Sequence, residues 1–248
     1  MFCLCVAAGL KERVLAGKFG VSTDTVSCVL ITWSNYLYLV LGSVQIWMTR
    51  EQVRRTMPVK FQQVTPNLRV IVDCTEFRRK NPKALTLHCE TFSTHKSYTT
   101  FKALIGVAPS GAVTFASKVF TGPISVKELA WQSGILELLE PGDEIMADKD
   151  FFFEKALVAV GAKLITPPIK HKSHLSREET TRSQATARLR ILIEQAIRRI
   201  KEYRIWDSPV PLTLAGTVNQ IWSCCCMMAN YQGPLNLEET SSTIVQAI

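Results

Sequence analysis

Short apolar runs separated by polar turns fill the middle of the chain, a pattern typical of β-strands. The continuous apolar run LRVIVD, residues 68 to 73, predicts a buried central strand. Alternating apolar and polar positions predict further strands over residues 84 to 92, 99 to 109 and 112 to 120, the last two as a hairpin. This region therefore predicts an antiparallel set of strands.

The second half of the chain changes to alternating helices and strands. The pattern predicts a helix over residues 125 to 139, a strand over 144 to 148, a short helix ending at Gly161, a strand stopped by Pro167, and a long amphipathic helix over about 183 to 203. This order of elements is that of an α/β, ribonuclease H-like catalytic domain.

A helix, turn and helix are predicted over residues 14 to 33. Gly20 suits the left-handed position after the first helix, and Ser22 suits the N-cap of the second. The apolar positions expected to face inward are Val21, Val26, Val29 and Leu30. Such a unit can place its second helix in a DNA major groove, but it is also a common packing unit. Gly9 lies where the usual first supporting helix would run, so we expect that helix to be missing or degraded, as in a shortened copy.

Four regions follow from this pattern. Residues 1 to 48 form a small helix-turn-helix-like region, 49 to 67 a polar linker, 68 to 234 the catalytic domain, and 235 to 248 a tail. Residues 29 to 48 are uncharged and long enough to span a membrane, but polar residues interrupt them, and we expect a helix packed on the catalytic domain instead.

Charge is distributed unevenly along the 248 residues. The net charge is +8, and residues 151 to 204 hold twelve Lys or Arg against five Asp or Glu. Such a surplus favours a polyanionic partner such as nucleic acid, although a solvated basic helix face is the alternative. The eight cysteines lack zinc-site spacing, and we expect Cys224, Cys225 and Cys226 to be reduced, buried thiols in an intracellular protein. The first residues do not resemble a signal peptide.

Three carboxylates lie where a metal-dependent nuclease would need them. Asp73 ends the apolar run of the first strand, Asp148 ends the strand EIMAD, and Glu194 lies in the long helix. Carboxylates at strand ends are held rigidly and can converge with a helix residue on a pair of Mg²⁺ ions. Glu76 is a rival ligand for the first position, and Asp150 for the second. Asp148 could instead cap the following helix.

Helix geometry places Glu194 among cations. At 100° per residue, Arg190, Arg198 and Lys201 fall on its side of the helix. The apolar residues of the opposite side are Leu189, Leu192, Ile193, Ala196 and Ile200. Glu194 could therefore be an ordinary i, i+4 partner of Arg190 or Arg198, or a metal-binding carboxylate in a phosphate-attracting surface.

Five motifs, in this order, give the chain a family resemblance. VIVDCTEF, FKALIGVAPSGAVTFASKVFTGPISVKEL, LLEPGDEIMADKDF, LITPPI and IEQAIRRIKEYRI together resemble the catalytic domain of PIF/Harbinger-type DDE transposases, a DDE superfamily endonuclease domain. The resemblance covers about residues 14 to 234. It implies a catalytic and metal-binding triad of Asp73, Asp148 and Glu194, and Mg²⁺ or Mn²⁺ as cofactor.

The resemblance also implies partners and a location. The substrate would be double-stranded DNA at the ends of a transposable element, contacted by basic residues near the site. Candidates for these contacts are Lys96, Lys149, Arg190, Arg198 and Lys201. Some relatives need a separate DNA-binding partner protein, and a homo-oligomer and a nuclear location are further expectations.

One position departs from the family pattern. Relatives usually have glycine two residues after the second Asp, where this chain has Asp150. An added carboxylate beside the metals could distort the site. Two functions follow: a DNA endonuclease and strand transferase, or a transposase-derived DNA-binding protein without catalysis. An intracellular scaffold without a DNA role is the third alternative.

Overall fold

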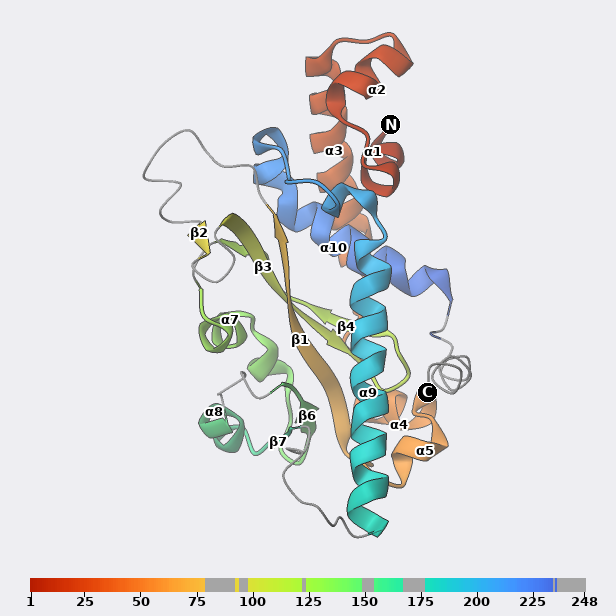
Figure 1. Ribbon diagram of the computed structural model, residues 1–248, viewed down its shortest axis with the longest axis vertical. Helices are drawn as coiled ribbons and strands as arrows, with labels where there is room; N and C mark the ends of the chain where they lie inside the picture. The colour runs from red at the N-terminus through yellow and green to blue at the C-terminus, as the bar shows by residue number, and fades with distance from the viewer. Residues whose placement is uncertain are drawn as a thin grey trace, which may run out of the picture.

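The sheet at the centre of the molecule is built around β1 (Leu68–Arg78), the strand that carries Asp73 (Figure 1). The structure is a computed structural model, and it describes residues 1–78, 92–93, 98–121, 124–148, 154–166, 177–233 and 235. β1 is longer than the predicted strand: it continues five residues past Asp73 while pairing with β3 (Tyr98–Val107). Asp73 is therefore inside a strand, and its prediction as a strand end is wrong.

The described strands form one mixed sheet. Its order is β2-β3-β1-β6-β7, with β4 and β5 also paired to β3. The bounds are β2 (Phe92–Ser93), β4 (Val113–Ala116), β5 (Phe120–Thr121), β6 (Glu144–Met146) and β7 (Lys163–Ile165). β3 runs antiparallel to β1, whereas β6 runs parallel to β1 and β7 parallel to β6. This arrangement is consistent with the predicted ribonuclease H-like fold. The predicted strand over 84 to 92 lies outside the described residues, except for its last residue.

Side chains of β1 alternate between two hydrophobic clusters, one on each face of the sheet. Val70 and Val72 pack in the cluster that faces α7 (Val126–Gln132), η1 (Ile135–Leu138) and α8 (Glu154–Ala159). Ile71 and Phe77 pack in the cluster on the other face. The helix predicted over 125 to 139 is interrupted in the structure, because Gly134 adopts a positive φ of 81° between α7 and η1.

The second face is covered by α9 (Arg177–Lys201) and α10 (Val218–Ala229). α9 lies along β1 in Figure 1 and corresponds to the long predicted helix. Its five predicted apolar positions are all buried, which confirms the expected orientation of the helix. Between the two helices lie η2 (Arg204–Trp206) and η3 (Leu212–Thr217), and η4 (Asn230–Gln232) follows α10.

Three helices form the N-terminal end of the molecule, at the top of Figure 1. They are α1 (Phe2–Ala8), α2 (Glu12–Phe19) and α3 (Thr23–Gly42). The expected first helix is not missing, because α1 is present, but it is only seven residues long and Gly9, at φ 64°, ends it. Gly20 has the predicted left-handed conformation, and the Ser22 hydroxyl accepts a hydrogen bond from the Thr25 amide at 3.1 Å.

The packing of α3 agrees in part with its prediction. Val26 and Leu30 are buried, but Val21 is 37% exposed. α3 packs on α2 and α10, where the Gln220 side chain donates to Asn35 at 3.0 Å. Within the described residues, α3 is the one helix whose length and composition would allow it to cross a membrane, and 17% of its most apolar window is buried. Because α10 belongs to the predicted catalytic domain, the expected packing of this helix on that domain is confirmed, whereas DNA binding by the N-terminal unit stays a prediction.

The predicted polar linker over 49 to 67 is structured. It contains α4 (Arg50–Thr56) and α5 (Val59–Gln62), and Thr49 caps α4 in a capping box with Gln52. Val53, Met57 and Phe61 are buried against the sheet. The prediction failed because these three apolar residues are separated mostly by charged and polar ones and are divided between two short helices and the residue that joins them, so that neither helix shows a clear apolar period.

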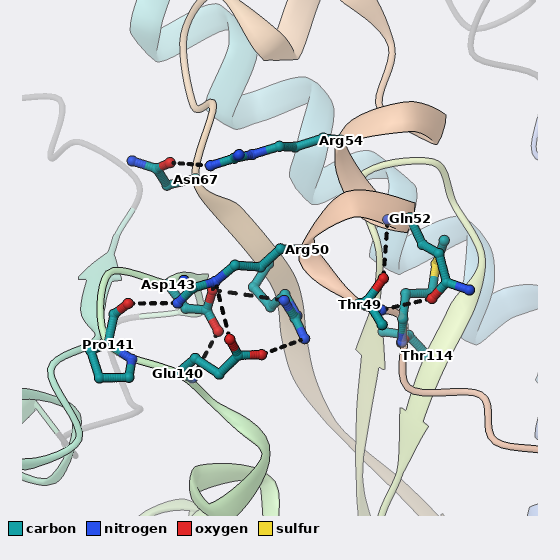
Figure 2. Close-up of polar contacts among 11 residues, drawn as sticks. Thr49, Arg50, Gln52, Arg54, Asn67, Thr114, Glu140, Pro141 and Asp143 are labelled. Carbon is teal, nitrogen blue, oxygen red and sulfur yellow. Dashed lines mark hydrogen bonds and ion pairs between the residues drawn. The ribbon is translucent and has the colours of Figure 1, made fainter.

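Arg50, Arg69, Glu140 and Asp143 form an ionic network that we call the α4 clamp. Figure 2 shows Arg50, Glu140 and Asp143 of this network. Arg50 Nε donates to Asp143 Oδ1 at 2.8 Å, and Arg50 also donates to the Pro141 carbonyl at 2.6 Å. Arg69 Nη2 lies 3.4 Å from Glu140 Oε1, and Arg69 Nη1 lies 3.9 Å from Asp143 Oδ1. Since Arg69 and Asp143 are both buried, the clamp fixes α4 to the start of β6 from inside the protein.

Candidate active site

Asp73 and Asp148 lie beside each other because of the strand register. β1 and β6 are parallel neighbours, and Ile71 pairs with Met146. Asp73 and Asp148 each follow their paired residue by two positions, and adjacent strands lie about 4.8 Å apart. Asp148 comes just past the end of β6, as predicted, whereas β1 continues through Asp73. The sheet therefore brings together two carboxylates that are 75 residues apart in the sequence.

The third predicted residue, Glu194, joins them through Arg190. Arg190 Nη2 lies 2.9 Å from Asp148 Oδ2, and Arg190 Nε lies 3.4 Å from Glu194 Oε1. The predicted i, i+4 pair on α9 is thus present, and the same guanidinium also reaches the sheet. Asp73, Asp148 and Arg190 line one small pocket of about 30 Å³ between β1, β6 and α9.

Electrostatics link all three carboxylates. Burial is the main reason that the pKa of Asp73 is raised above its ordinary value, and the charges of Asp148 and Glu194 raise it further. The Cys74 amide, which donates to Asp73 Oδ1 at 2.7 Å, and the Arg190 guanidinium act in the opposite direction. The three acidic groups therefore share one electrostatic environment, in which charge on Asp73 is disfavoured and a cation would be favoured.

The chemistry of this donor set fits a hard divalent ion. Carboxylate oxygens are the ligands that Mg²⁺ and Mn²⁺ prefer. Among the described residues, however, no three acidic, histidine or cysteine side chains are close enough to hold an ion as they are placed. The positive charge between Asp148 and Glu194 is that of Arg190. Holding a metal here would require these side chains to rearrange.

The rival ligands have different positions. Glu76 is three residues after Asp73 in a continuously paired strand, so its side chain emerges on the opposite face of the sheet. Its carboxylate lies 3.5 Å from the Lys102 ammonium, which donates to the Ile124 carbonyl. This placement disfavours Glu76 as a ligand beside Asp148. Asp150 lies outside the described residues.

Of the basic residues predicted to contact DNA, three lie within the described residues and two lie outside them. Arg190, Arg198 and Lys201 are all exposed on the side of α9 that carries Glu194. Lys96 and Lys149 lie outside the described residues. Sequence reasoning included Arg190 as a DNA contact or a partner of Glu194, but it missed the ion pair with Asp148. That contact joins residues 42 apart and has no local pattern that could have revealed it.

Comparison with known proteins adds an independent finding. The family model described as DDE superfamily endonuclease matches residues 72–230, which is more than half of the chain. The matched segment contains Asp73, Asp148 and Glu194, together with the elements that position them. No curated protein matches the chain.

Proposed function

The chain belongs to the DDE superfamily of endonucleases, and from this premise we propose that it is a transposase-like DNA endonuclease and strand transferase of the PIF/Harbinger type. The observation that carries the proposal is that Asp73 and Asp148 line one acidic pocket together with Arg190, whose guanidinium also pairs with Glu194. Membership of the superfamily supports a nuclease in general, and the acidic pocket supplies the residues for its chemistry.

Each carboxylate has a distinct structural role in the proposed site. Asp73 is held inside β1 and Asp148 just after β6, so both are fixed by the sheet, while Glu194 approaches from α9. These three side chains would hold two divalent ions. When bound, such ions activate the attacking oxygen and stabilise the leaving oxygen of a phosphodiester.

The DNA strand would run along the exposed side of α9. Arg198 and Lys201 follow Glu194 on the same side of the helix, about 6 and 10 Å along its axis at 1.5 Å per residue. Their charges suit phosphate contacts, which position DNA without reading its sequence. Under this proposal the substrate is the ends of a transposable element, the protein acts in the nucleus, and a separate DNA-binding protein or a second copy of the chain completes recognition.

The proposal is tested by cleavage of DNA that carries candidate element ends, with Mg²⁺ or Mn²⁺. We expect Asp73→Asn and Glu194→Gln each to reduce cleavage at least about 100-fold, because changes to groups that merely orient metal ligands already cost 10- to 100-fold. Glu137→Gln is the matched control, because Glu137 is an exposed carboxylate on η1, on the other face of the sheet. Cleavage by Asp73→Asn at the parental rate would rule out this triad.

A second function is favoured by one observation. The guanidinium of Arg190 already pairs with both Asp148 and Glu194, and no three-ligand group is formed within the described residues. A transposase-derived DNA-binding protein without catalysis would keep this arrangement permanently. DNA affinity that falls steeply with salt, without nicking in Mg²⁺ or Mn²⁺, would select this alternative.

A further inference from the structure

Arg190 occupies the position between two carboxylates that a metal ion would need. We propose that Arg190 is a built-in counter-cation of the acidic site, which holds Asp148 and Glu194 until a divalent ion binds and then leaves them. This inference rests on the proposed metal-dependent function. It assigns Arg190 as a positioning residue that competes with the metal.

The geometry of the guanidinium supports this role. Two different nitrogens are used: Nη2 faces Asp148 at 2.9 Å and Nε faces Glu194 at 3.4 Å. A planar guanidinium has its donors in a fixed fork, so one group can fix two carboxylates relative to each other. Because Asp148 follows β6 and Glu194 lies on α9, this single cation joins the sheet to the helix.

The guanidinium and a divalent ion would compete for the same carboxylate oxygens. Mg²⁺ coordinates carboxylate oxygens at about 2.1 Å. An ion at that distance from Asp148 Oδ2 would share the oxygen with a guanidinium nitrogen that now lies 2.9 Å from it. The two cations would repel each other across one acceptor, and charge repulsion at such a distance is strong where solvent is partly excluded.

The Arg190 side chain is also free to move away from the two carboxylates towards solvent. Its side chain is 48% exposed, and it emerges from the solvent-facing side of α9, so release needs no change in the buried core. Once released, the guanidinium would lie at the rim of the acidic pocket, on the same side of α9 as Arg198. An arginine in that place can bind phosphate in a bidentate manner. Metal binding would therefore make a phosphate contact available beside the site.

A simple structural ion pair makes a different prediction from a competing cation. If Arg190 merely arranges the carboxylates for metal, its removal weakens metal binding. If it competes, its removal strengthens metal binding. The direction of the change in Mn²⁺ affinity thus separates the two roles, and it requires neither DNA nor cleavage.

The experiment measures Mn²⁺ binding to the full chain without DNA, by the electron paramagnetic resonance signal of free Mn²⁺. We expect Arg190→Gln to bind Mn²⁺ about three- to tenfold more tightly than the parent, since two partly exposed ion pairs no longer oppose the ion. Arg190→Lys keeps the charge but loses the fork, and its affinity should lie between the two. Arg188→Gln is the control, because Arg188 is exposed on α9 two residues before Arg190. This substitution removes the same charge and should leave the Mn²⁺ affinity unchanged.

Each outcome decides something. Mn²⁺ binding by Arg190→Gln that is equal to or weaker than that of the parent overturns the inference and leaves the proposed function standing. Tighter binding by Arg188→Gln to the same degree also overturns it, because the effect would then be general electrostatics. If neither the parent nor Arg190→Gln binds Mn²⁺, the inference and the metal-dependent function both fail. If the Mn²⁺ affinities change as expected but the parent does not cleave DNA, only the proposed endonuclease activity fails.

Discussion

A single carboxylate, Asp73, shows how the site conflicts with the stability of the fold. It is partly buried in β1 beside two other acids, and burial is the first cause that raises its pKa. The surrounding structure therefore disfavours the ionised form of this carboxylate. Such local conflict is typical of functional positions, where activity is maintained at the expense of stability.

Asp73→Asn should therefore stabilise the protein at pH 7 in the presence of a chelator. The pKa of Asp73 in the folded protein is raised above the ordinary value of 3.8. The stability contributed by its neutral form is thus present below pH 3.8 and is lost as the pH rises through the raised pKa. Asparagine stays neutral and can still accept the Cys74 hydrogen bond. Urea unfolding should show a higher midpoint for Asp73→Asn at pH 7, and the difference should shrink towards pH 4.

The control for this prediction is Asp207→Asn, since Asp207 is an exposed carboxylate. A lower midpoint for Asp73→Asn at pH 7 would contradict the argument. It would mean that the ionised carboxylate, through Cys74 and Arg190, contributes more stability than its burial costs.

The buried cysteines behave as the sequence predicted. Cys224, Cys225 and Cys226 are free and buried in α10, and burial raises the pKa of the Cys224 thiol to about 11. A thiol with such a pKa stays protonated at neutral pH and is a poor nucleophile. These residues are therefore core packing groups.

At the scale of elements, the sequence predicted most of the sheet and the long helix, since their apolar periods are regular. The buried face of α9 and the turn at Gly20 were both identified from spacing alone. The full length of β1 was not, because the residues after Asp73 are mostly polar and their pairing with β3 depends on tertiary structure. The same limit explains why the approach of Arg190 to Asp148 could not be foreseen, whereas the three carboxylates were proposed from their places in the predicted elements and stay a prediction.

The α4 clamp provides a prediction for these elements. Asp143→Ala should lower the free energy of unfolding by about 3–5 kcal/mol, because it leaves the buried Arg69 guanidinium without its buried counter-charge. Glu140→Ala is the matched control: its side chain is 55% exposed, and we expect a loss of about 1 kcal/mol or less. Urea unfolding of both variants measures the difference. Equal losses would mean that the clamp contributes nothing beyond ordinary surface ion pairs.

At the scale of the whole molecule, α9 carries part of the basic surplus and also lines the acidic pocket. The surplus over residues 151 to 204 includes the cations on the exposed side of α9, next to Glu194. By contrast, Asp24 is the one charged residue in α3, whose exposed side includes Trp33, Tyr36 and Leu39. A recognition helix without lysine or arginine lacks the phosphate contacts that provide most DNA affinity. We therefore expect non-specific DNA binding to depend on α9 more than on α3.

This expectation predicts how the DNA affinity changes with salt concentration when cations of α9 are removed. The double variant Arg198→Gln with Lys201→Gln should bind duplex DNA more weakly than the parent, and the slope of log affinity against log salt should become shallower by about 1 to 2, because each lost phosphate contact contributes about 0.9. Lys127→Gln, on exposed α7 across the sheet, is the control and should keep the parental slope. An unchanged slope for the double variant would place the DNA away from α9, and the acidic pocket would then lack the neighbouring phosphate contacts that a DNA endonuclease needs.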